Sequence, residues 1–296
     1  MEEKIGYLIP CHNDPEHVSK LIAALDYKAD FYIHVDKKTD IGPFRQLIRQ
    51  PNVYWVEERT RVSWAGISQV KATLSLMKQA LAGGPYVKII LLSGSCYPIK
   101  SNDYIHRYFT REPDREHIRY FNMLTSNDHY RSQVLRKWFK EPFYLGVLPF
   151  LRYADKGLRV LLNKCRFRNR WDTRIVPHFG SNWIALTPAC CAYIFDFLER
   201  HPGYWEMNRR TFSPDEHFFH TIVANSPFNN RADGLQAFTG RGTYKLANYH
   251  IIHPSLTKWY TESDLEEIKG SDKLFVRKLK TGVSSSLVDQ INQFIA

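Results

Sequence analysis

Two adjacent carboxylates stand where they could do acid–base chemistry, in the octet SPDEHFFH at residues 213–220. The octet opens a predicted helix, whose dipole favours the ionised form of an acid on its first turn. Glu216 is therefore a candidate general base, and Asp215 is a candidate for orienting neighbouring groups. The same octet is also typical of a capping box, with Ser213 as the N-cap, Pro214 as the first helical residue and Glu216 as the partner of the cap.

Two histidines in the octet allow a different chemistry. Asp215, His217 and His220 could hold the metal of a hydrolase. Their spacing is neither H-E-x-x-H nor H-x-x-E-H, and the chain contains no Asp-x-Asp metal clamp. We therefore expect no metal and no other cofactor, and the metallohydrolase is kept as an alternative.

Basic residues near the C-terminus could do the work of a metal. A nucleoside diphosphate that leaves a sugar carries about two negative charges, which ammonium groups can stabilise as point charges. The candidates are Lys258 in TKWYT, and Arg277 and Lys278 in LFVRK. Each of them is also explained as a solubilising surface residue.

The elements that must position these residues alternate between strand and helix over residues 1–125. Apolar runs predict strands over 4–11, 31–35, 53–56 and 87–92. Helical spacing predicts a helix from Pro15 with Val18, Leu21, Ile22 and Leu25 on one face, and further helices over 41–49 and 67–81. Such an alternation is typical of a parallel sheet that is covered on both faces.

Ligands of parallel sheets bind at the carboxyl ends of the strands. Cys11-His12, Asp36-Lys37 and residues 93–100 follow three of the predicted strands, so we expect a nucleotide to bind among them. Asp36 could hold a uracil or ribose edge, or it could simply begin a turn. Trp64 precedes the helix over 67–81, where core packing or a hydrophobic staple would also explain it.

The second half of the chain is less regular. A strand is predicted over 182–187 and a helix over 189–200, followed by the octet, a glycine-rich loop over 234–242 and an amphipathic tail. Residues 143–174 mix aromatic and basic side chains, with six Lys/Arg and one acid from position 159 onward. This composition predicts an interfacial helix or loop that meets anionic lipid or a lipid-linked acceptor. A solvated helix that leads into a mobile loop would have the same composition.

The composition limits the partners and the compartment. A formal charge of +11 over 296 residues favours an anionic partner. The charges are scattered and no nucleic-acid module is present, so a nucleic-acid-binding protein is only an alternative. The five cysteines are odd in number and lack C-x-x-C spacing, which indicates reduced thiols. With no signal peptide and no long apolar span, we expect a cytoplasmic protein with peripheral contact to the inner face of the membrane.

Seven stretches occur in a specific order along the chain: YLIPCHND at 7–14, FYIHVDKK at 31–38, RVSWAGISQVKATLSLMKQAL at 61–81, LLSGSCYPIKS at 91–101, GSNWIALT at 180–187, SPDEHFFHTIVANSP at 213–227 and HPSLTKWYTESDLEEIKGSDKLFVRK at 253–278. In these stretches the chain resembles glycosyltransferase family 14. That family contains the core-2/I-branching β-1,6-N-acetylglucosaminyltransferases and the peptide O-xylosyltransferases. Together the stretches cover nearly the whole chain.

The resemblance implies a GT-A-like, Rossmann-like α/β fold with a mostly parallel central sheet flanked by helices. It implies one catalytic domain over 1–296, with a nucleotide-binding half at 1–125, an acceptor and catalytic half at 126–243 and a diphosphate-binding segment at 244–296. Glu216 matches the catalytic base of the family. The residues that match its uridine-contacting segments are Pro10, Cys11, His12, Asp36, Lys37, Lys38 and Arg61.

The diphosphate-binding basic residues match less uniformly. Lys278 matches the second of them, and Lys258 matches the first unless the alignment slips to Ser255. Asp215, Trp64 and Arg277 are supporting candidates. Cys96 stands where family members usually carry an Asp, which leaves the polar contact of that loop open.

The resemblance and the residues together predict an inverting, metal-independent glycosyltransferase. It would move N-acetylglucosamine from UDP-N-acetylglucosamine to a hydroxyl of a glycan or lipid-linked glycan, forming a β-linkage such as β-1,6. The same chemistry with UDP-xylose or another UDP-sugar is the nearest alternative. No nucleic-acid partner is expected.

Overall fold

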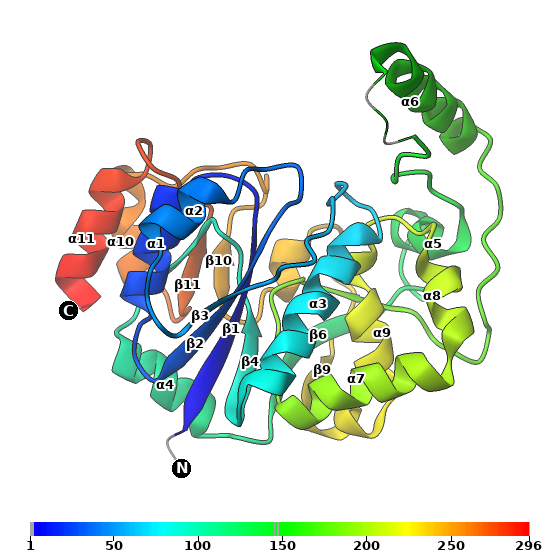
Figure 1. Ribbon diagram of the computed structural model, residues 1–296. Helices are drawn as coiled ribbons and strands as arrows, with labels where there is room; N and C mark the ends of the chain where they lie inside the picture. Colours follow the sequence, from blue (N-terminus) through cyan, green and yellow to red (C-terminus); the bar gives the residue numbers. More distant parts are fainter. Residues whose placement is uncertain (1–2, 145, 147, 296) are drawn as a thin grey trace.

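A mixed β-sheet runs through the centre of the protein (Figure 1), and the computed structural model describes residues 3–144, 146 and 148–295. The first half of the sheet is parallel and contains β1 Lys4–Cys11, β2 Ala29–Val35, β3 Val53–Trp55 and β4 Tyr86–Leu91. β1 lies between β2 and β4, and β3 pairs with the outer edge of β2. All seven positions of β2 are buried, as expected for a strand that is covered on both faces. The apolar runs therefore predicted this half correctly.

Three helices connect these strands: α1 Pro15–Ala24, α2 Gly42–Leu47 and α3 Ser68–Gly83. The predicted apolar face of α1 is buried, because Val18, Leu21, Ile22 and Leu25 are at most 1% exposed. α3 packs on β1 and β2. It ends at Gly83, where an added Cβ would come within 1.8 Å of the Tyr32 hydroxyl. This helix end therefore requires a glycine, because its backbone lies close to the Tyr32 side chain of β2.

The second half of the sheet corrects the prediction. Its strands are β6 Glu116–Asn122, β7 His178–Gly180, β8 Ala185–Leu186 and β9 Ala232–Leu235. β8 is antiparallel to both β4 and β6, and β7 is antiparallel to β6. Only residues 181–184 separate β7 from β8, and both strands run antiparallel to β6, so this stretch of the chain continues along β6 without a crossover. The strand predicted over 182–187 is reduced to the two residues of β8. The full order is β3-β2-β1-β4-β8-β6-β7, with β9 beside β6.

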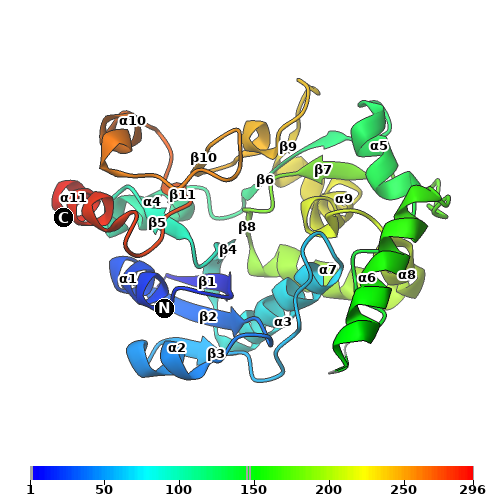
Figure 2. The same cartoon turned by 90° about the horizontal axis from the view of Figure 1, so that it is seen from above.

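The helices of the second half surround this sheet. They are α4 Asn102–Thr110, α5 Asp128–Leu135, α6 Pro149–Lys164, α7 Pro188–Arg200, α8 Pro202–Asn208, α9 Phe218–Ala224, α10 Leu265–Lys269 and α11 Ser285–Ile295. α7 packs on β4 and α3, and α9 packs on β6 and β7. Viewed from above, α11 and α6 lie at opposite ends of the molecule (Figure 2). The predicted class, an α/β fold with a mostly parallel sheet flanked by helices, is confirmed.

A second, three-stranded sheet brings the C-terminal segment back to the first half. It contains β5 Cys96–Pro98, β10 His250–Ile252 and β11 Phe275–Arg277, in the order β10-β11-β5. One hydrophobic core includes side chains from Ile5 to Ile291 and so spans both sheets. The division of the chain at 125 and 243 stays a prediction.

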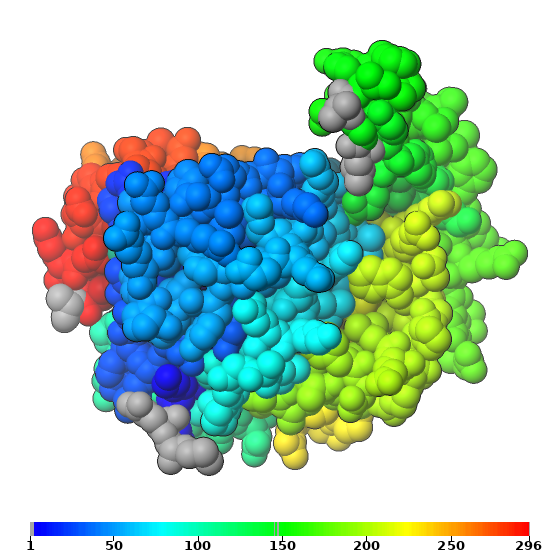
Figure 3. Space-filling view, in the orientation of Figure 1, coloured from blue at the N-terminus to red at the C-terminus, as the bar shows by residue number. Residues whose placement is uncertain are grey.

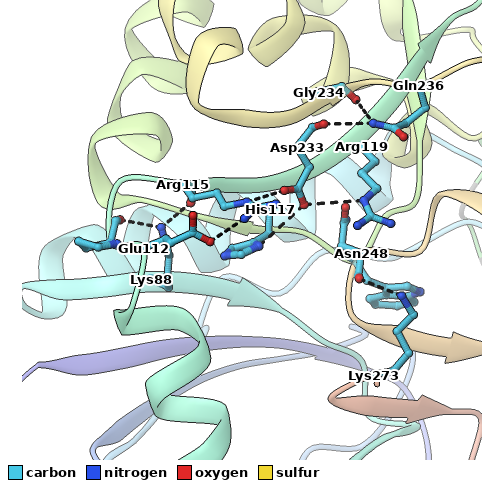
Figure 4. Close-up of polar contacts among 12 residues, drawn as sticks. Lys88, Glu112, Arg115, His117, Arg119, Asp233, Gly234, Gln236, Asn248 and Lys273 are labelled. Carbon is cyan, nitrogen blue, oxygen red and sulfur yellow. Dashed lines mark hydrogen bonds and ion pairs between the residues drawn. The ribbon is translucent and has the colours of Figure 1, made fainter. Parts of the chain in front are cut away.

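A buried polar network fixes β6 against its neighbours (Figure 4). The fully buried Lys88 of β4 donates to the backbone carbonyls of Pro113 and Arg115. The Asp233 carboxylate of β9 accepts a bond of 2.7 Å from Arg115 Nε and lies 3.8 Å from His117 Nδ1. Buried charges are stable only when they are paired in this way, so the network ties β4, β6 and β9 together.

The five cysteines are unpaired thiols, four buried and Cys165 exposed, as the sequence predicted. Within the described residues no helix is both long and apolar enough to pass through a bilayer.

Candidate active site

A cavity of about 530 Å³ brings together five of the predicted site residues. Glu216 and Asp215 reach it from the loop before α9, and Arg277 and Lys278 reach it from the end of β11. Trp64 also contributes to its lining. The remaining lining residues are Gln69, His129, Tyr130, Gln133, Phe179, Ser181, Asn182, Trp183, Phe212, Ser213, Arg241, Gly242, Thr243, Ile252 and Leu256.

The carboxylate pair stands on a tight turn and not on the first turn of an α-helix. Pro214–Glu216 form a 3₁₀ turn, and α9 begins only at Phe218. Ser213 has a left-handed backbone, with φ 46° and ψ 57°, and its side chain makes no capping bond. The capping box predicted from the sequence is therefore wrong. A serine with positive φ is a strained residue of the kind that clusters at functional sites.

A second left-handed residue holds this turn in place. Ala65 has a φ of 56°, and its carbonyl accepts a bond of 3.2 Å from the Ser213 amide. The Gln69 side chain on α3 connects the same two loops. Its Oε1 accepts from the Ala65 amide at 2.7 Å, and its Nε2 donates to Asp215 Oδ2 at 3.1 Å. The position of Asp215 is thus fixed from α3.

The carboxyl groups of Asp215 and Glu216 bind their protons more tightly than ordinary acids. Burial raises the pKa of Asp215, and burial together with the neighbouring Asp215 raises the pKa of Glu216 well above its usual value. Arg277 opposes both shifts. The helix dipole, which we expected to favour ionised Glu216, is outweighed because the group stands on a short turn inside the cavity. A raised pKa makes Glu216 a stronger base once it is ionised.

Arg277 is the cation whose charge acts on both carboxyl groups. Its guanidinium stacks over the Trp183 ring at 4.5 Å, and its Nε donates to Ser93 Oγ at 3.2 Å. Burial lowers the pKa of Arg277, while Cys96 and the two carboxyl groups counteract that shift. Within the described residues no carboxylate lies within 4 Å of it. Arg277 therefore keeps an uncompensated positive charge at the cavity.

Two lysines extend this positive charge beyond Arg277. The Nζ atoms of Lys278 and Lys280 lie 4.5 Å and 5.0 Å from the centre of the Trp259 ring. Burial and then the charges of Arg277 and Lys280 lower the pKa of Lys278. Three cations held this close together favour an anion with more than one charge.

Lys258 is placed differently. Its Nζ forms an ion pair of 2.6 Å with Asp264 Oδ1, and it lies outside the lining of the cavity. Ser255, the competing position, is also outside that lining and is bonded to His253. The assignment of Lys258 to the diphosphate stays a prediction.

The predicted uridine-contacting residues gather at the carboxyl ends of β1 and β2. The Asp36 amide donates to the Cys11 carbonyl at 2.9 Å, and Thr39 Oγ1 donates to the His12 carbonyl at 2.8 Å. Gly94, in the loop after β4, donates to the Pro10 carbonyl at 3.2 Å. The strand ends therefore meet where the sequence placed them.

The side chain of Asp36 bonds within its own loop and also accepts from the Val62 amide at 3.4 Å. Its Oδ1 accepts from the amide of Lys38 at 2.9 Å, and its Oδ2 pairs with the Lys38 ammonium at 3.2 Å. Asp36 thus begins a turn, which is one of the two roles considered for it from the sequence; the other is contact with a uracil or ribose edge. Lys37 and Arg61 are exposed beside it, and a contact of any of these residues with uridine stays a prediction.

The strand-end loops adjoin the basic C-terminal segment. Asp14, at the start of α1, accepts bonds of 2.8 Å and 2.7 Å from the amide and hydroxyl of Thr281. Since Thr281 follows Lys280 directly, this contact places the uridine-side loops next to the cation cluster. An extended nucleotide could therefore reach both.

Trp64 is neither a core residue nor a staple. Its side chain is 75% exposed, packs edge-on against Phe212 at 5.7 Å and carries the Lys140 ammonium 5.2 Å from its ring. An exposed aromatic face at the rim of a cavity is a common surface for stacking a sugar or another flat apolar face. The simple packing explanation for Trp64 is therefore wrong.

Three buried acceptor oxygens belong to side chains that line the cavity. Gln133 Oε1, Asn182 Oδ1 and Asp215 Oδ1 have no hydrogen-bond partner among the described residues. An unpaired buried acceptor is costly, so these atoms call for donors from outside the chain. A ligand with several hydroxyl groups would supply them.

The two histidines of the octet do not join Asp215 in a metal site. His217 packs edge-on against Trp171, and His220 Nε2 lies 3.0 Å from the Ser181 carbonyl. Burial lowers the pKa of both to about 3. In the part of the chain that the structure describes, no three His, Cys, Asp or Glu side chains form a group that could hold a metal.

Several lining residues were missed from the sequence. Gln69 is an ordinary polar residue on α3, and Trp183 was assigned to a strand core. Arg241 stands between two glycines in a loop that had been noted only for its glycine content. Lys280 lies two residues beyond Lys278 and could have been found by extending the basic run. The other residues gave no signal, because only the fold brings them to the cavity.

Comparison with known proteins decides the family. The family model "Branch: Core-2/I-Branching enzyme" matches residues 5–234. The chain belongs to the Core-2/I-branching enzyme family. This Core-2/I-branching family member is also similar to xylosyltransferase 1 of Homo sapiens, with 25% identity over 236 residues that cover 76% of the chain and 22% of the relative. Its similarity to xylosyltransferase 2 of Rattus norvegicus is 25% over 241 residues, which cover 76% of the chain and 25% of the relative.

The chain spans about a quarter of the length of these curated relatives. A solved structure, mouse xyloside xylosyltransferase 1 in its apo form, aligns over 79% of the chain and 85% of its own, with 12% identity and a TM-score of 0.29. The family match confirms the predicted resemblance to a family of branching enzymes.

Proposed function

We propose that the protein transfers N-acetylglucosamine from UDP-N-acetylglucosamine to a hydroxyl group of a glycan, with inversion and without a metal. The linkage would be β, and β-1,6 is the first to test. The observation that carries this proposal is the shared cavity, in which a carboxyl group of raised pKa and a partly buried guanidinium without an ion pair among the described residues lie together. Family membership supplies the reaction class.

In the proposed reaction ionised Glu216 removes the proton of the acceptor hydroxyl as its oxygen attacks the anomeric carbon. The bond from that carbon to the diphosphate oxygen breaks on the opposite face, so the configuration inverts. The departing UDP takes the bonding electrons, and Arg277 and Lys278 stabilise its charge. Lys258 would assist only if its ion pair with Asp264 opened.

UDP-xylose is the second candidate donor. The observation in its favour is that the curated relatives described above are named xylosyltransferases. Because they are 25% identical to the chain and much longer, their donor is not transferred directly. Either sugar offers hydroxyl donors to the unpaired oxygens of Gln133, Asn182 and Asp215.

We also propose that the acceptor is presented at a membrane, as a lipid-linked glycan on the cytoplasmic face. Residues 143–174 would make the peripheral contact, since they combine exposed aromatic and basic side chains. The location rests on the sequence argument from reduced cysteines.

A panel of UDP-sugars tests the proposal directly. Release of UDP is measured for each donor, with and without EDTA, and we expect turnover with UDP-N-acetylglucosamine that EDTA does not change. Turnover confined to UDP-xylose would select the second donor. Loss of activity in EDTA that added magnesium or manganese restores would refute the metal-independent mechanism.

Calorimetry on Lys278→Ala should show weaker UDP binding, and unchanged affinity would reject the phosphate role of Lys278.

A further inference from the structure

Helix α6 has the reverse of the usual amphipathic arrangement. A surface helix normally turns its apolar side chains toward the core. In α6 only Asp155 is buried, whereas Phe150, Tyr153, Leu158, Val160 and Leu161 are between 49% and 77% exposed. Figures 1 and 3 show the helix standing clear of the body of the protein. Its apolar side chains therefore lack a partner within the described residues.

A polar stripe holds the inner side of α6 against the chain. Asp155 Oδ1 accepts from the Phe143 amide at 2.8 Å, and Asp155 Oδ2 accepts from Arg159 Nε at 2.9 Å. One turn further, Asn163 Oδ1 accepts from the Phe139 amide at 2.8 Å. Asp155, Arg159 and Asn163 are spaced by four residues, so they lie on one face of the helix.

This stripe fixes the rotation of α6. At about 100° per residue, Phe150 and Leu161 lie nearly opposite Arg159. The apolar face is thus directed away from the body by hydrogen bonds on the other side. A contiguous exposed apolar face of this kind marks an interaction surface.

Basic side chains adjoin one end of the apolar face. A cluster stands at the C-terminal end of α6: Lys164, Arg166, Arg168 and Arg170. All four are exposed, and none forms an ion pair within the described residues, unlike Arg159 and Arg174, which pair with aspartates. An apolar face flanked by cations without ion pairs is complementary to a bilayer with anionic headgroups.

Helix α6 lies next to the predicted uridine-side loops. A cavity of about 550 Å³ separates α6 from the segment 61–63 and is lined by Lys38 and Arg61 on one side and by Arg152 and Lys156 on the other. The inner side of α6 thus faces the predicted uridine-side loops, while the apolar face lies on the opposite side of the helix.

We propose that the outer face of α6, formed by Phe150, Tyr153, Leu158, Val160 and Leu161, docks on an anionic membrane surface. This inference deepens the membrane contact of the proposed function by naming the face and the lipid chemistry. Apolar side chains would enter the interface, and the four cations Lys164, Arg166, Arg168 and Arg170 would meet the headgroups.

The test is sedimentation of the full chain with vesicles, either of phosphatidylcholine alone or mixed about two to one with phosphatidylglycerol. We expect binding to the mixed vesicles and little to the neutral ones. The double variant Phe150→Ser/Leu161→Ser should lose at least about tenfold in binding. Leu235→Ser is the matched control, since Leu235 is 65% exposed on β9 and should bind as the native chain does.

Replacing basic residues by Gln tests whether the cations near α6 contribute to vesicle binding. Replacing Arg166, Arg168 and Arg170 by Gln should weaken binding to mixed vesicles about fivefold for each residue. The same change at the exposed Arg49, Lys71 and Lys78 lowers the net charge equally and should leave most of the binding intact. An equal loss in both triple variants would overturn the inference, because general charge would then explain it.

Two further outcomes bear on the inference. The native chain could fail to bind mixed vesicles and instead form a dimer that dissociates in the variant Phe150→Ser/Leu161→Ser. The outer face of α6 would then be a contact between copies of the chain, and the inference would be wrong. Calorimetry with UDP monitors the active site separately in every variant. A chain that binds vesicles but no UDP would refute the proposed transfer and leave the docking surface standing.

Discussion

Replacing Arg277 by Met should weaken UDP binding far more than replacing Lys258 by Met. Both residues are candidates for the diphosphate, but they differ in their partners. Lys258 is already paired at 2.6 Å with Asp264. Arg277 uses its Nε for Ser93 and stacks on Trp183, while no carboxylate of the described residues lies within 4 Å.

The magnitude follows from the hydrogen bonds that Arg277 can still make. A bond to a charged group contributes about 1.5 to 3 kcal/mol. If the guanidinium makes one such bond to the diphosphate, its loss should raise the Kd for UDP about 10- to 150-fold. Lys258→Met removes a partly exposed, already paired charge, and we expect less than about a threefold change.

Calorimetry with UDP measures both effects. The variant Arg277→Lys keeps the charge but loses the planar guanidinium. Its affinity for UDP should lie between that of Arg277→Met and that of the native chain. Thermal unfolding of each variant checks that the fold is retained. Binding by Arg277→Met within threefold of native, or a larger loss in Lys258→Met, would refute the reasoning and restore Lys258 as the principal cation.

Three further predictions concern the base, its neighbour and the buried network. Glu216→Gln should abolish transfer and leave UDP affinity within a few-fold of native, so retained turnover would remove its role as the base. Asp215→Asn deletes the charge that raises the pKa of Glu216, so Glu216 should ionise at lower pH and the acid limb of the kcat/KM profile should move down; an upward shift would contradict this cause. Glu116 accepts bonds of 2.8 Å and 2.6 Å from the amide and hydroxyl of Thr187, so Glu116→Ala should cost about 2 to 5 kcal/mol in urea unfolding. A loss below about 1 kcal/mol would show that water replaces these bonds.

The first half of the fold could be predicted because its sequence signals are local. Near-continuous apolar runs separated by helical spacing leave few alternatives for β1 to β4. The second half breaks that rule, since β7 and β8 follow one another without a helix and each pairs antiparallel with β6. Periodicity in the sequence carries no information on which strand a two-residue segment such as Ala185–Leu186 will join.

The site shows the same division between local and tertiary information. Glu216 could be found because it stands in a recognisable segment. The geometry of that segment could not, because Ser213 takes its left-handed backbone from contacts with Ala65, far away in the chain. Likewise, the sequence predicts an interfacial helix or loop over 143–174, but only the bonds of Asp155 and Asn163 decide which face of α6 is turned outward.

The cysteine at position 96 now has a physical interpretation. In the ladder between β5 and β11, Cys96 is the register partner of Arg277. Its thiol contacts Ser93 Oγ at 3.3 Å, the same hydroxyl that accepts from Arg277 Nε. Burial raises the pKa of this thiol, so it stays neutral. A carboxylate here would compete for the guanidinium, whereas a neutral thiol leaves the charge of Arg277 directed at Asp215, Glu216 and any diphosphate in the cavity.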